Sequence, residues 1–265
     1  MIISLYKKLI HTNIMIKKVL TGNTQTVVLE GLERPESLIF NGVHINTTIK
    51  VEIQRVGEDN TKVITLIPLA RLHEAQQKII RLRTGNPVLP VRYNYDNSTL
   101  SGIIIQLSIG GEIPLSDVND KIIISLANMS NPGGSMFVVG SGVTSNVLYR
   151  ILDQNYEGKN DELRLPVDKF DFLIFDKSEQ NFPQQIEKFY ENDVDREDFE
   201  QILLKEQIKF GCVAFATGLD INGTEIDTPV FGSYSSIVID VTNLQTLLLK
   251  DDRGNDYKFH GVKFE

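Results

Sequence analysis

The chain of 265 residues lacks tryptophan altogether and contains a single cysteine, Cys212. One cysteine excludes an intrachain disulfide framework and a metal site built from several cysteines. The missing tryptophan and the small share of aromatic residues disfavour a lectin that stacks sugar rings on aromatic side chains. Cys212 itself stands in an apolar run, FGCVAF, where we expect a small buried side chain.

Long hydrophobic runs and catalytic motifs are also missing. No apolar run reaches the ~18 residues that a membrane-spanning helix requires, and no small-residue cleavage site follows residues 1–20, so a secretory signal peptide is not expected. No nucleophile-elbow, zinc-protease, phosphate-loop or dinucleotide-binding motif occurs. The sequence therefore predicts a protein that is not an enzyme and that uses no cofactor. Four histidines stand singly, without a second ligand at metal-site spacing: His11, His44, His73 and His260.

Two acidic clusters are the remaining candidates for ion binding. The first lies at residues 193–198 (Asp193, Asp195, Glu197, Asp198), and the second lies at residues 251–256 (Asp251, Asp252, Asp256). Oxygen-rich loops can bind calcium, but neither cluster has the EF-hand spacing with its closing glutamate. A solvated helix cap and a hairpin turn explain the two clusters more simply, so no metal site is predicted.

Charge is distributed unevenly along the chain. The formal net charge of −8 disfavours a general nucleic-acid binder, which needs a basic surface. Acidic residues outnumber basic ones between residues 151 and 207, whereas residues 1–20 contain no acid and four lysines: Lys7, Lys8, Lys17 and Lys18. We interpret residues 1–23 as a basic, amphipathic N-terminal arm that touches lipid head groups or packaged nucleic acid. A helix or strand packed on its own protein explains the same pattern.

From residue 24 onward, most of the chain has the short apolar runs and turn signals of β-structure. Residues 48–56 alternate cleanly between apolar and polar side chains, as a half-buried strand does. Asn41-Gly42 is typical of a two-residue hairpin turn, and a further turn is predicted at Asn222-Gly223. About fourteen to sixteen short strands are expected, and this number favours β-sandwiches over a parallel sheet.

Only two segments have helical periodicity. Residues 69–83 place Leu72, Gln76 and Ile79 along one face. Residues 183–207 contain two apolar triplets at helical spacing, separated by the poor helix formers at 192–195. This second segment predicts a short helix from Pro183, a break, and another helix from near Asp195.

The two helical segments divide the chain into halves with the same order of strands, helix and strands. The turn-forming cluster Asn131-Pro132-Gly133-Gly134 is the predicted boundary between them. The sequence therefore predicts a mainly β fold of two antiparallel eight-stranded jelly rolls, with a helix inserted in each. The first domain is expected at residues 24–130 with its helix at 69–83, and the second at 131–265 with its helices at 183–207.

In this architecture the chain resembles the double jelly-roll major capsid proteins of tailless icosahedral bacteriophages that carry an internal membrane. No short motif defines that family, so no functional residue is carried over. The resemblance implies a structural protein of the virion, made in the host cytoplasm, whose homotrimer has a pseudo-hexagonal outline and builds an icosahedral shell. Its implied partners are further copies, other capsid proteins such as a vertex protein, and a lipid membrane beneath the shell, but no specific nucleic-acid sequence.

The alternative is a β-sandwich module that binds a receptor or a carbohydrate, such as a viral spike or an adhesin. It would present an aromatic or calcium-lined groove on one sandwich and would form no shell.

Overall fold

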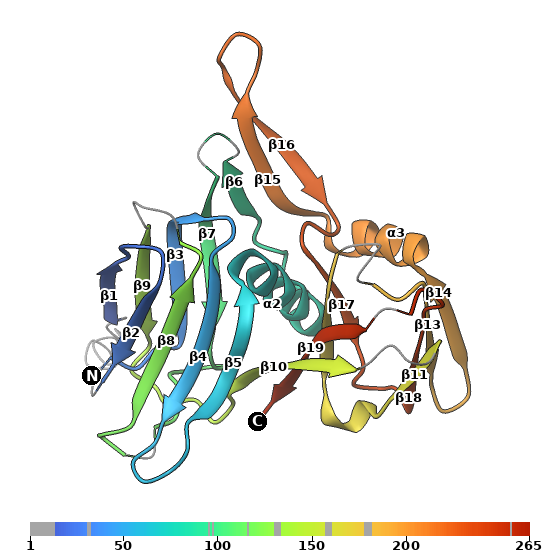
Figure 1. The fold of residues 1–265 in the computed structure, drawn as a ribbon, viewed down its shortest axis with the longest axis horizontal. Helices are drawn as coiled ribbons and strands as arrows, with labels where there is room; N and C mark the ends of the chain where they lie inside the picture. Colours follow the sequence, from blue (N-terminus) through green and yellow to red (C-terminus); the bar gives the residue numbers. More distant parts are fainter. Residues whose placement is uncertain are drawn as a thin grey trace, which may run out of the picture.

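The structure is a computed structural model that describes residues 14–265 apart from 31–32, 95, 97, 116, 130–133, 157–160, 178–181 and 255. The described chain is mainly β, and its strands form three sheets that pack as two β-sandwiches side by side (Figure 1). We call them the first and the second sandwich, in chain order. Two α-helices accompany them, α2 (Leu69–Thr84) and α3 (Phe199–Phe210), with a short 3-10 helix η1 (Val167–Lys169).

A seven-stranded sheet forms one layer of the first sandwich and extends into the projecting hairpin β15–β16. Its pairings are antiparallel except for β15 with β6. In spatial order its strands are β1 (Ile14–Val19), β9 (Ser135–Gly140), β3 (Ser37–His44), β7 (Thr99–Gln106), β6 (Val91–Asn94), β15 (Cys212–Leu219) and β16 (Glu225–Phe231).

An eight-stranded sheet runs through both sandwiches and joins them. The join is the parallel pairing of β10 with β5, where Ile151 lies opposite Ile64. In spatial order its strands are β17 (Ser236–Asp240), β12 (Phe172–Asp176), β19 (Tyr257–Phe264), β10 (Tyr149–Tyr156), β5 (Thr61–Pro68), β4 (Thr48–Gln54), β8 (Lys121–Ala127) and β2 (Gln25–Leu29).

A four-stranded sheet completes the second sandwich by packing on β17, β12, β19 and β10. The eight strands enclose a core of aromatic and aliphatic side chains that includes Phe175, Ile186 and Leu249. Their order and connections are those of a jelly roll. In spatial order the strands of this small sheet are β11 (Glu162–Leu165), β18 (Thr246–Lys250), β13 (Gln185–Phe189) and β14 (Val194–Asp198).

The expected mainly β, double jelly-roll fold is confirmed, with one α-helix accompanying each sandwich. The predicted helix at 69–83 is α2, which differs from the expectation by one residue. The domain boundaries at residues 23 and 131 stay predictions. Strands from both sides of residue 131 share one sheet, since β9 pairs with β1 and β3. Neither α-helix of the described chain combines the length and the apolar character that crossing a bilayer requires.

The helix predicted from Pro183 is wrong. Residues 185–189 form β13, which lies between β18 and β14 in the small sheet. Ile186 and Phe189 have helical spacing, but β13 gains hydrogen-bonded partners on both edges, and this pairing overrides the local pattern. The second predicted helix exists but starts at Phe199 rather than near Asp195, because residues 194–198 pair as β14.

The hairpin turn predicted at Asn41-Gly42 is also wrong. β3 runs straight through both residues, and its register against β7 shifts there as a β-bulge. Gly42 has a φ of +65°, and the same tolerance of positive φ that suits a tight turn also suits a bulge. The predicted turn at Asn222-Gly223 is confirmed between β15 and β16.

Candidate functional site: a buried polar network and exposed apolar surfaces

Helix α2 carries an unusual set of buried polar side chains. Between residues 73 and 78, every position except Ala75 carries a buried polar or charged side chain: His73, Glu74, Gln76, Gln77 and Lys78. A helix that buries polar groups must provide each of them with a partner. Two groups of partners exist, one on the seven-stranded sheet and one in the second sandwich.

His73 and Gln76 act on the seven-stranded sheet in place of a neighbouring strand. The Ile104 N–H donates to His73 Nδ1 at 3.0 Å, and His73 Nε2 donates to the Leu89 carbonyl at 2.9 Å. Gln76 donates to the Gln106 carbonyl at 2.7 Å and accepts from the Gln106 N–H at 2.8 Å. These bonds satisfy the edge of β7 beyond the short pairing with β6, so α2 closes the sheet where a strand would otherwise be needed.

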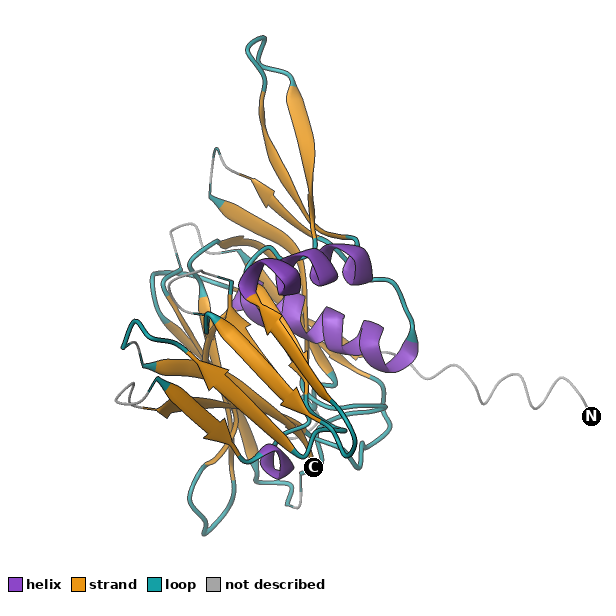
Figure 2. Cartoon of the chain, turned by 90° about the vertical axis from the view of Figure 1, so that its right-hand side faces the viewer, coloured by secondary structure: helices purple, strands orange, loops and turns teal. Residues whose placement is uncertain are grey.

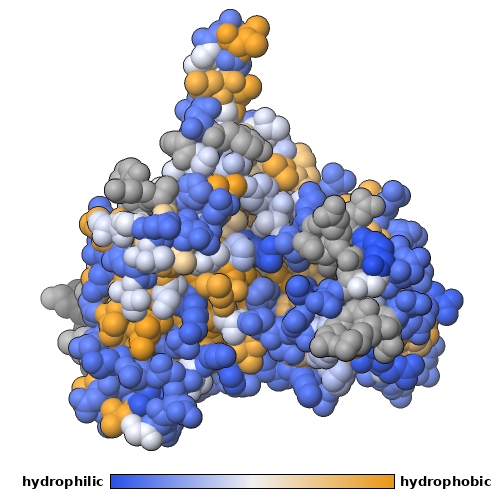
Figure 3. Space-filling model, in the orientation of Figure 1, coloured by the Kyte–Doolittle hydropathy of each residue, from blue (hydrophilic) through white to orange (hydrophobic). Residues whose placement is uncertain are grey.

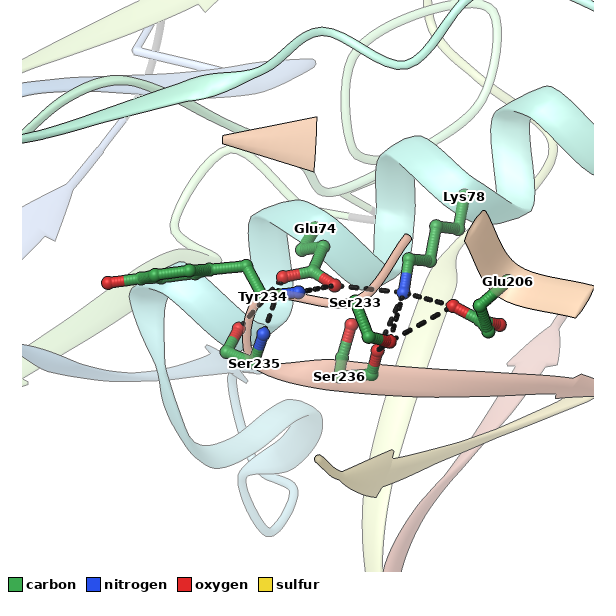
Figure 4. A network of polar contacts seen from close by, with 7 residues as sticks. All are labelled: Glu74, Lys78, Glu206, Ser233, Tyr234, Ser235 and Ser236. Carbon is green, nitrogen blue, oxygen red and sulfur yellow. Dashed lines mark hydrogen bonds and ion pairs between the residues drawn. The ribbon is translucent and has the colours of Figure 1, made fainter. Parts of the chain in front are cut away.

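Glu74 and Lys78 connect α2 to the second sandwich (Figure 4). Lys78 is 0% exposed, and its ammonium group lies 2.8 Å from Glu74 Oε1, 2.9 Å from Ser233 Oγ and 2.6 Å from the Ser236 carbonyl. It also pairs directly with Glu206 of α3. The three N–H donors of the lysine are therefore all engaged.

The two carboxylates of this network have further donors. Glu74 accepts the backbone N–H groups of Tyr234 at 3.0 Å and Ser235 at 2.7 Å. Glu206 accepts from Ser233 Oγ at 3.1 Å. Burial raises the pKa of Glu206, and the neighbouring Lys78 opposes that shift. With its charges paired and hydrogen-bonded, the network is a clamp that fixes α2, α3 and the turn before β17 in one geometry.

The four lysines predicted as an arm are not brought together as one helix. Lys7 and Lys8 lie outside the described residues. Lys17 and Lys18 belong to β1, so this part of the predicted arm is a strand that pairs with β9 of its own protein. Lys18 pairs with Glu33 at 2.7 Å, and the Lys17 ammonium lies 5.8 Å from the centre of the Phe137 ring.

The acidic cluster at 193–198 serves the local structure. Glu197 is almost fully buried and pairs with both Lys188 and Lys205. Burial works to raise the pKa of Glu197, but the hydrogen bonds from the two lysines outweigh it and hold the pKa below its usual value. Asp198 is the N-cap of α3: its carboxylate accepts the Gln201 N–H at 2.8 Å, while the Gln201 side chain accepts the Asp198 N–H.

The second acidic cluster, at 251–256, is held mainly by Arg253. The Arg253 guanidinium donates to the Asp251 carboxylate at 2.7 Å and 2.6 Å. Burial works to raise the pKa of Asp251, and the hydrogen bonds from Arg253 outweigh it. Within the described ranges, no three histidine, cysteine or acidic side chains gather in a way that would hold a metal ion.

Exposed apolar side chains occur on many elements of the described chain, and two elements carry several of them each. The first is the β15–β16 hairpin, which projects from the molecule and carries exposed Leu219, Ile221 and Ile226 (Figure 3). The second is α3, where Leu204 and Ile208 are exposed one turn apart. Cys212, at the start of β15, is partly buried rather than fully buried as expected.

Comparison with known proteins finds similarity in structure only. No protein-family model matches the chain, and no curated protein matches its sequence. The major capsid protein P2 from Bacteriophage PM2 aligns with a TM-score of 0.48 and 12% identity, covering 96% of this chain and 97% of that chain. The PBSX exported protein XepA aligns with a TM-score of 0.23 and 10% identity, covering 94% and 86%. Neither similarity assigns a role to a residue of this chain.

Sequence reasoning missed the buried network. The one visible signal of buried polar groups on this helix is Gln76, which lies on the apolar face between Leu72 and Ile79 and bonds Gln106 rather than the Lys78 network. A polar residue at such a position indicates a specific buried partner. The partners Glu206 and Ser233 lie more than 120 residues further along the chain, so no local pattern could identify them.

Proposed function

We propose that the protein is a structural protein of the virion, the major capsid subunit of a bacteriophage. Three copies associate as a trimer with a pseudo-hexagonal outline, and the trimers build an icosahedral shell. The observation that carries this proposal is the rigid union of two jelly rolls in one chain, through a shared sheet and a buried ionic clamp. Three such chains around a threefold axis place six similar sandwiches in a ring, which is a shape that tiles a surface.

The proposed role is mechanical and needs no catalytic step. A shell subunit requires stiff bodies and lateral surfaces that recognise further copies. The clamp around Lys78 supplies stiffness between the sandwiches, and the exposed apolar positions on the hairpin and on α3 supply candidate lateral surfaces. Assembly would follow synthesis in the host cytoplasm and would involve other capsid proteins, such as a vertex protein.

The test is to measure the size and shape of the purified protein over a range of concentrations. Sedimentation velocity should show trimers in equilibrium with larger assemblies, and negative-stain electron microscopy should show particles with a pseudo-hexagonal outline. A protein that stays a monomer at every concentration, up to the millimolar range, would refute the proposed function.

The basic N-terminal segment is proposed to face the membrane or the genome inside the shell. Lys7 and Lys8 are the residues to test, because removing residues 14–19 would delete strand β1 from its sheet. Replacing both with glutamine should weaken binding to anionic vesicles, which depends on surface lysines. A control that replaces the exposed Lys62 and Lys169 should bind as the wild type does. Equal vesicle binding by both variants would remove this role.

A further inference from the structure

The β15–β16 hairpin is the most prominent projection of the molecule, and apolar side chains gather on it (Figures 1 and 3). Leu219, Ile221 and Ile226 are each more than half exposed, and Ile221 is 101% exposed. The turn has a defined shape, because the Asp220 carboxylate accepts the N–H groups of Asn222 at 2.8 Å and Thr224 at 2.7 Å. Apolar side chains gathered on a projecting element mark an interaction surface.

The charge of the hairpin limits what it can bind. Residues 212–231 contain three acids, Asp220, Glu225 and Asp227, and no lysine, arginine or histidine. An anionic lipid surface would repel this element. A suitable partner instead presents an apolar recess with positive charge beside it.

The chain itself has such a recess beneath α3, which we call the α3 groove. It is a cavity of about 300 Å³ whose apolar wall includes Ile202, Ile208 and Phe210. Ile208 is 79% exposed at its edge, so an incoming side chain would cover it.

Three lysines, Lys188, Lys205 and Lys209, also line the α3 groove, together with Glu197 and Glu206. Glu197 is paired with Lys188 and Lys205, and Glu206 is paired with Lys78. Lys209 lies 5.9 Å from the centre of the Phe210 ring and is exposed. It is therefore the cation best placed to meet a carboxylate from outside.

We propose that the tip of the β15–β16 hairpin of one copy docks in the α3 groove of a second copy, with Ile221 against the apolar wall and Glu225 facing Lys209. Within one chain the tip points away from α3 in both views, so the contact forms between copies (Figures 1 and 2). The two surfaces differ, so the contact is head-to-tail, and in the proposed trimer three such contacts close a ring. The inference rests on the proposed self-association and names one of its contacts.

The first experiment measures the association of Ile221→Ser by sedimentation velocity, beside Val56→Ser as the matched control. Val56 is an exposed apolar residue in the β4–β5 turn, 63% exposed, at the opposite end of the molecule from the hairpin tip (Figure 1). Neither change removes a packed side chain from the monomer. I221S should weaken association about tenfold or more, since a buried apolar side chain is lost from the interface, whereas V56S should not.

The second experiment exchanges the charges. Glu225→Lys and Lys209→Glu should each weaken association, and the double variant should recover most of the loss because the pair is restored with its signs reversed. In a mixture of isotopically light and heavy protein, carbodiimide should couple Lys209 of one copy to Glu225 of another, and mass spectrometry identifies the mixed peptide.

Three results would overturn the inference. If the wild type associates and I221S associates as strongly as V56S, the docking contact is wrong while the proposed self-association stands. If the wild type does not associate at all, both proposals fall. If I221S loses binding to neutral lipid vesicles but associates normally, the hairpin tip is a membrane element instead.

Discussion

Lys78 connects its own helix to two segments that are distant in the sequence, α3 and the stretch at residues 233–236. It reaches Glu74 on its own helix, Glu206 on α3, Ser233 in the turn before β17, and the carbonyl of Ser236, the first residue of β17. Buried ion pairs add little net stability compared with apolar packing, but removal of one member leaves the others buried and unpaired. The clamp therefore specifies how the sandwiches sit together more than it stabilises either of them.

Replacing Lys78 with methionine tests this role at the residue scale. K78M should lower the free energy of unfolding by about 3–5 kcal/mol, because Glu74 and Glu206 lose their buried cation. Chemical denaturation at neutral pH measures the change. Lys62→Met, at an exposed position, should stay within about 0.5 kcal/mol of the wild type. A loss below about 1 kcal/mol for K78M would show that the clamp is not coupled to folding.

His73 gives a prediction about pH. Burial lowers its pKa from the ordinary value of 6.5, although its bonds to Ile104 and Leu89 oppose the shift. The unfolded chain therefore takes up a proton at this histidine near pH 6.5, while the folded protein does so only at lower pH. The contribution of His73 to stability is complete above pH 6.5 and is lost as the pH falls through the lowered pKa.

The variant His73→Gln keeps one acceptor and one donor but cannot titrate. Denaturation curves between pH 7 and pH 5 should show a shallower loss of stability for H73Q than for the wild type, although H73Q starts from a lower value. Identical slopes for the two proteins would contradict the assignment of the titration to His73.

At the scale of elements, α3 starts at a defined capping box. Asp198 and Gln201 exchange side-chain and backbone hydrogen bonds at its first turn, directly after β14 ends. This box explains how one continuous segment changes from strand to helix without a linking loop.

Asp198→Ala should destabilise the protein by about 1 kcal/mol, the usual cost of losing an N-cap. Glu191→Ala, at an exposed position between β13 and β14, is the matched control and should have little effect. Thermal unfolding of the two variants measures the difference. Equal melting temperatures would mean that pairing of β14, rather than the cap, ends the strand and starts the helix.

The sequence predicts elements well where the pattern is local. α2 is predicted almost to the residue because its periodicity is long and a left-handed Gly85 ends it. Residues 185–189 mislead because Ile186 and Phe189 fit a helix, and only the distant β18 makes them a strand. The pair Asn41-Gly42 misleads for a related reason, since a tight turn and a β-bulge both need a residue that tolerates positive φ.

The candidate site was less predictable than the fold. Lys17 and Lys18 stand out in the sequence, yet both belong to strand β1. Lys18 also pairs with Glu33, 15 residues away. Apart from Glu74 on the same helix, the partners of Lys78 come from positions more than 120 residues away. Contacts of this kind depend on how α2 packs on β17, which no single-sequence pattern encodes.

At the scale of the whole molecule, the shared eight-stranded sheet and the clamp make one body of two sandwiches (Figures 1 and 4). Three copies of a rigid two-sandwich body can form a tile with a roughly hexagonal outline. Three copies whose sandwiches were joined by a flexible linker could not. In the proposed assembly, the acidic hairpin of one copy docks in the α3 groove of the next.

Electron cryo-microscopy of the assembled protein, or of particles that contain it, tests this account most directly. The account predicts a closed shell whose repeating tile is a trimer, with six upright sandwiches around each threefold axis and the hairpin of each subunit reaching its neighbour. Two results would contradict the account. One is a particle whose shell does not contain this chain; the other is purified protein that stays a single two-sandwich chain without threefold arrangement.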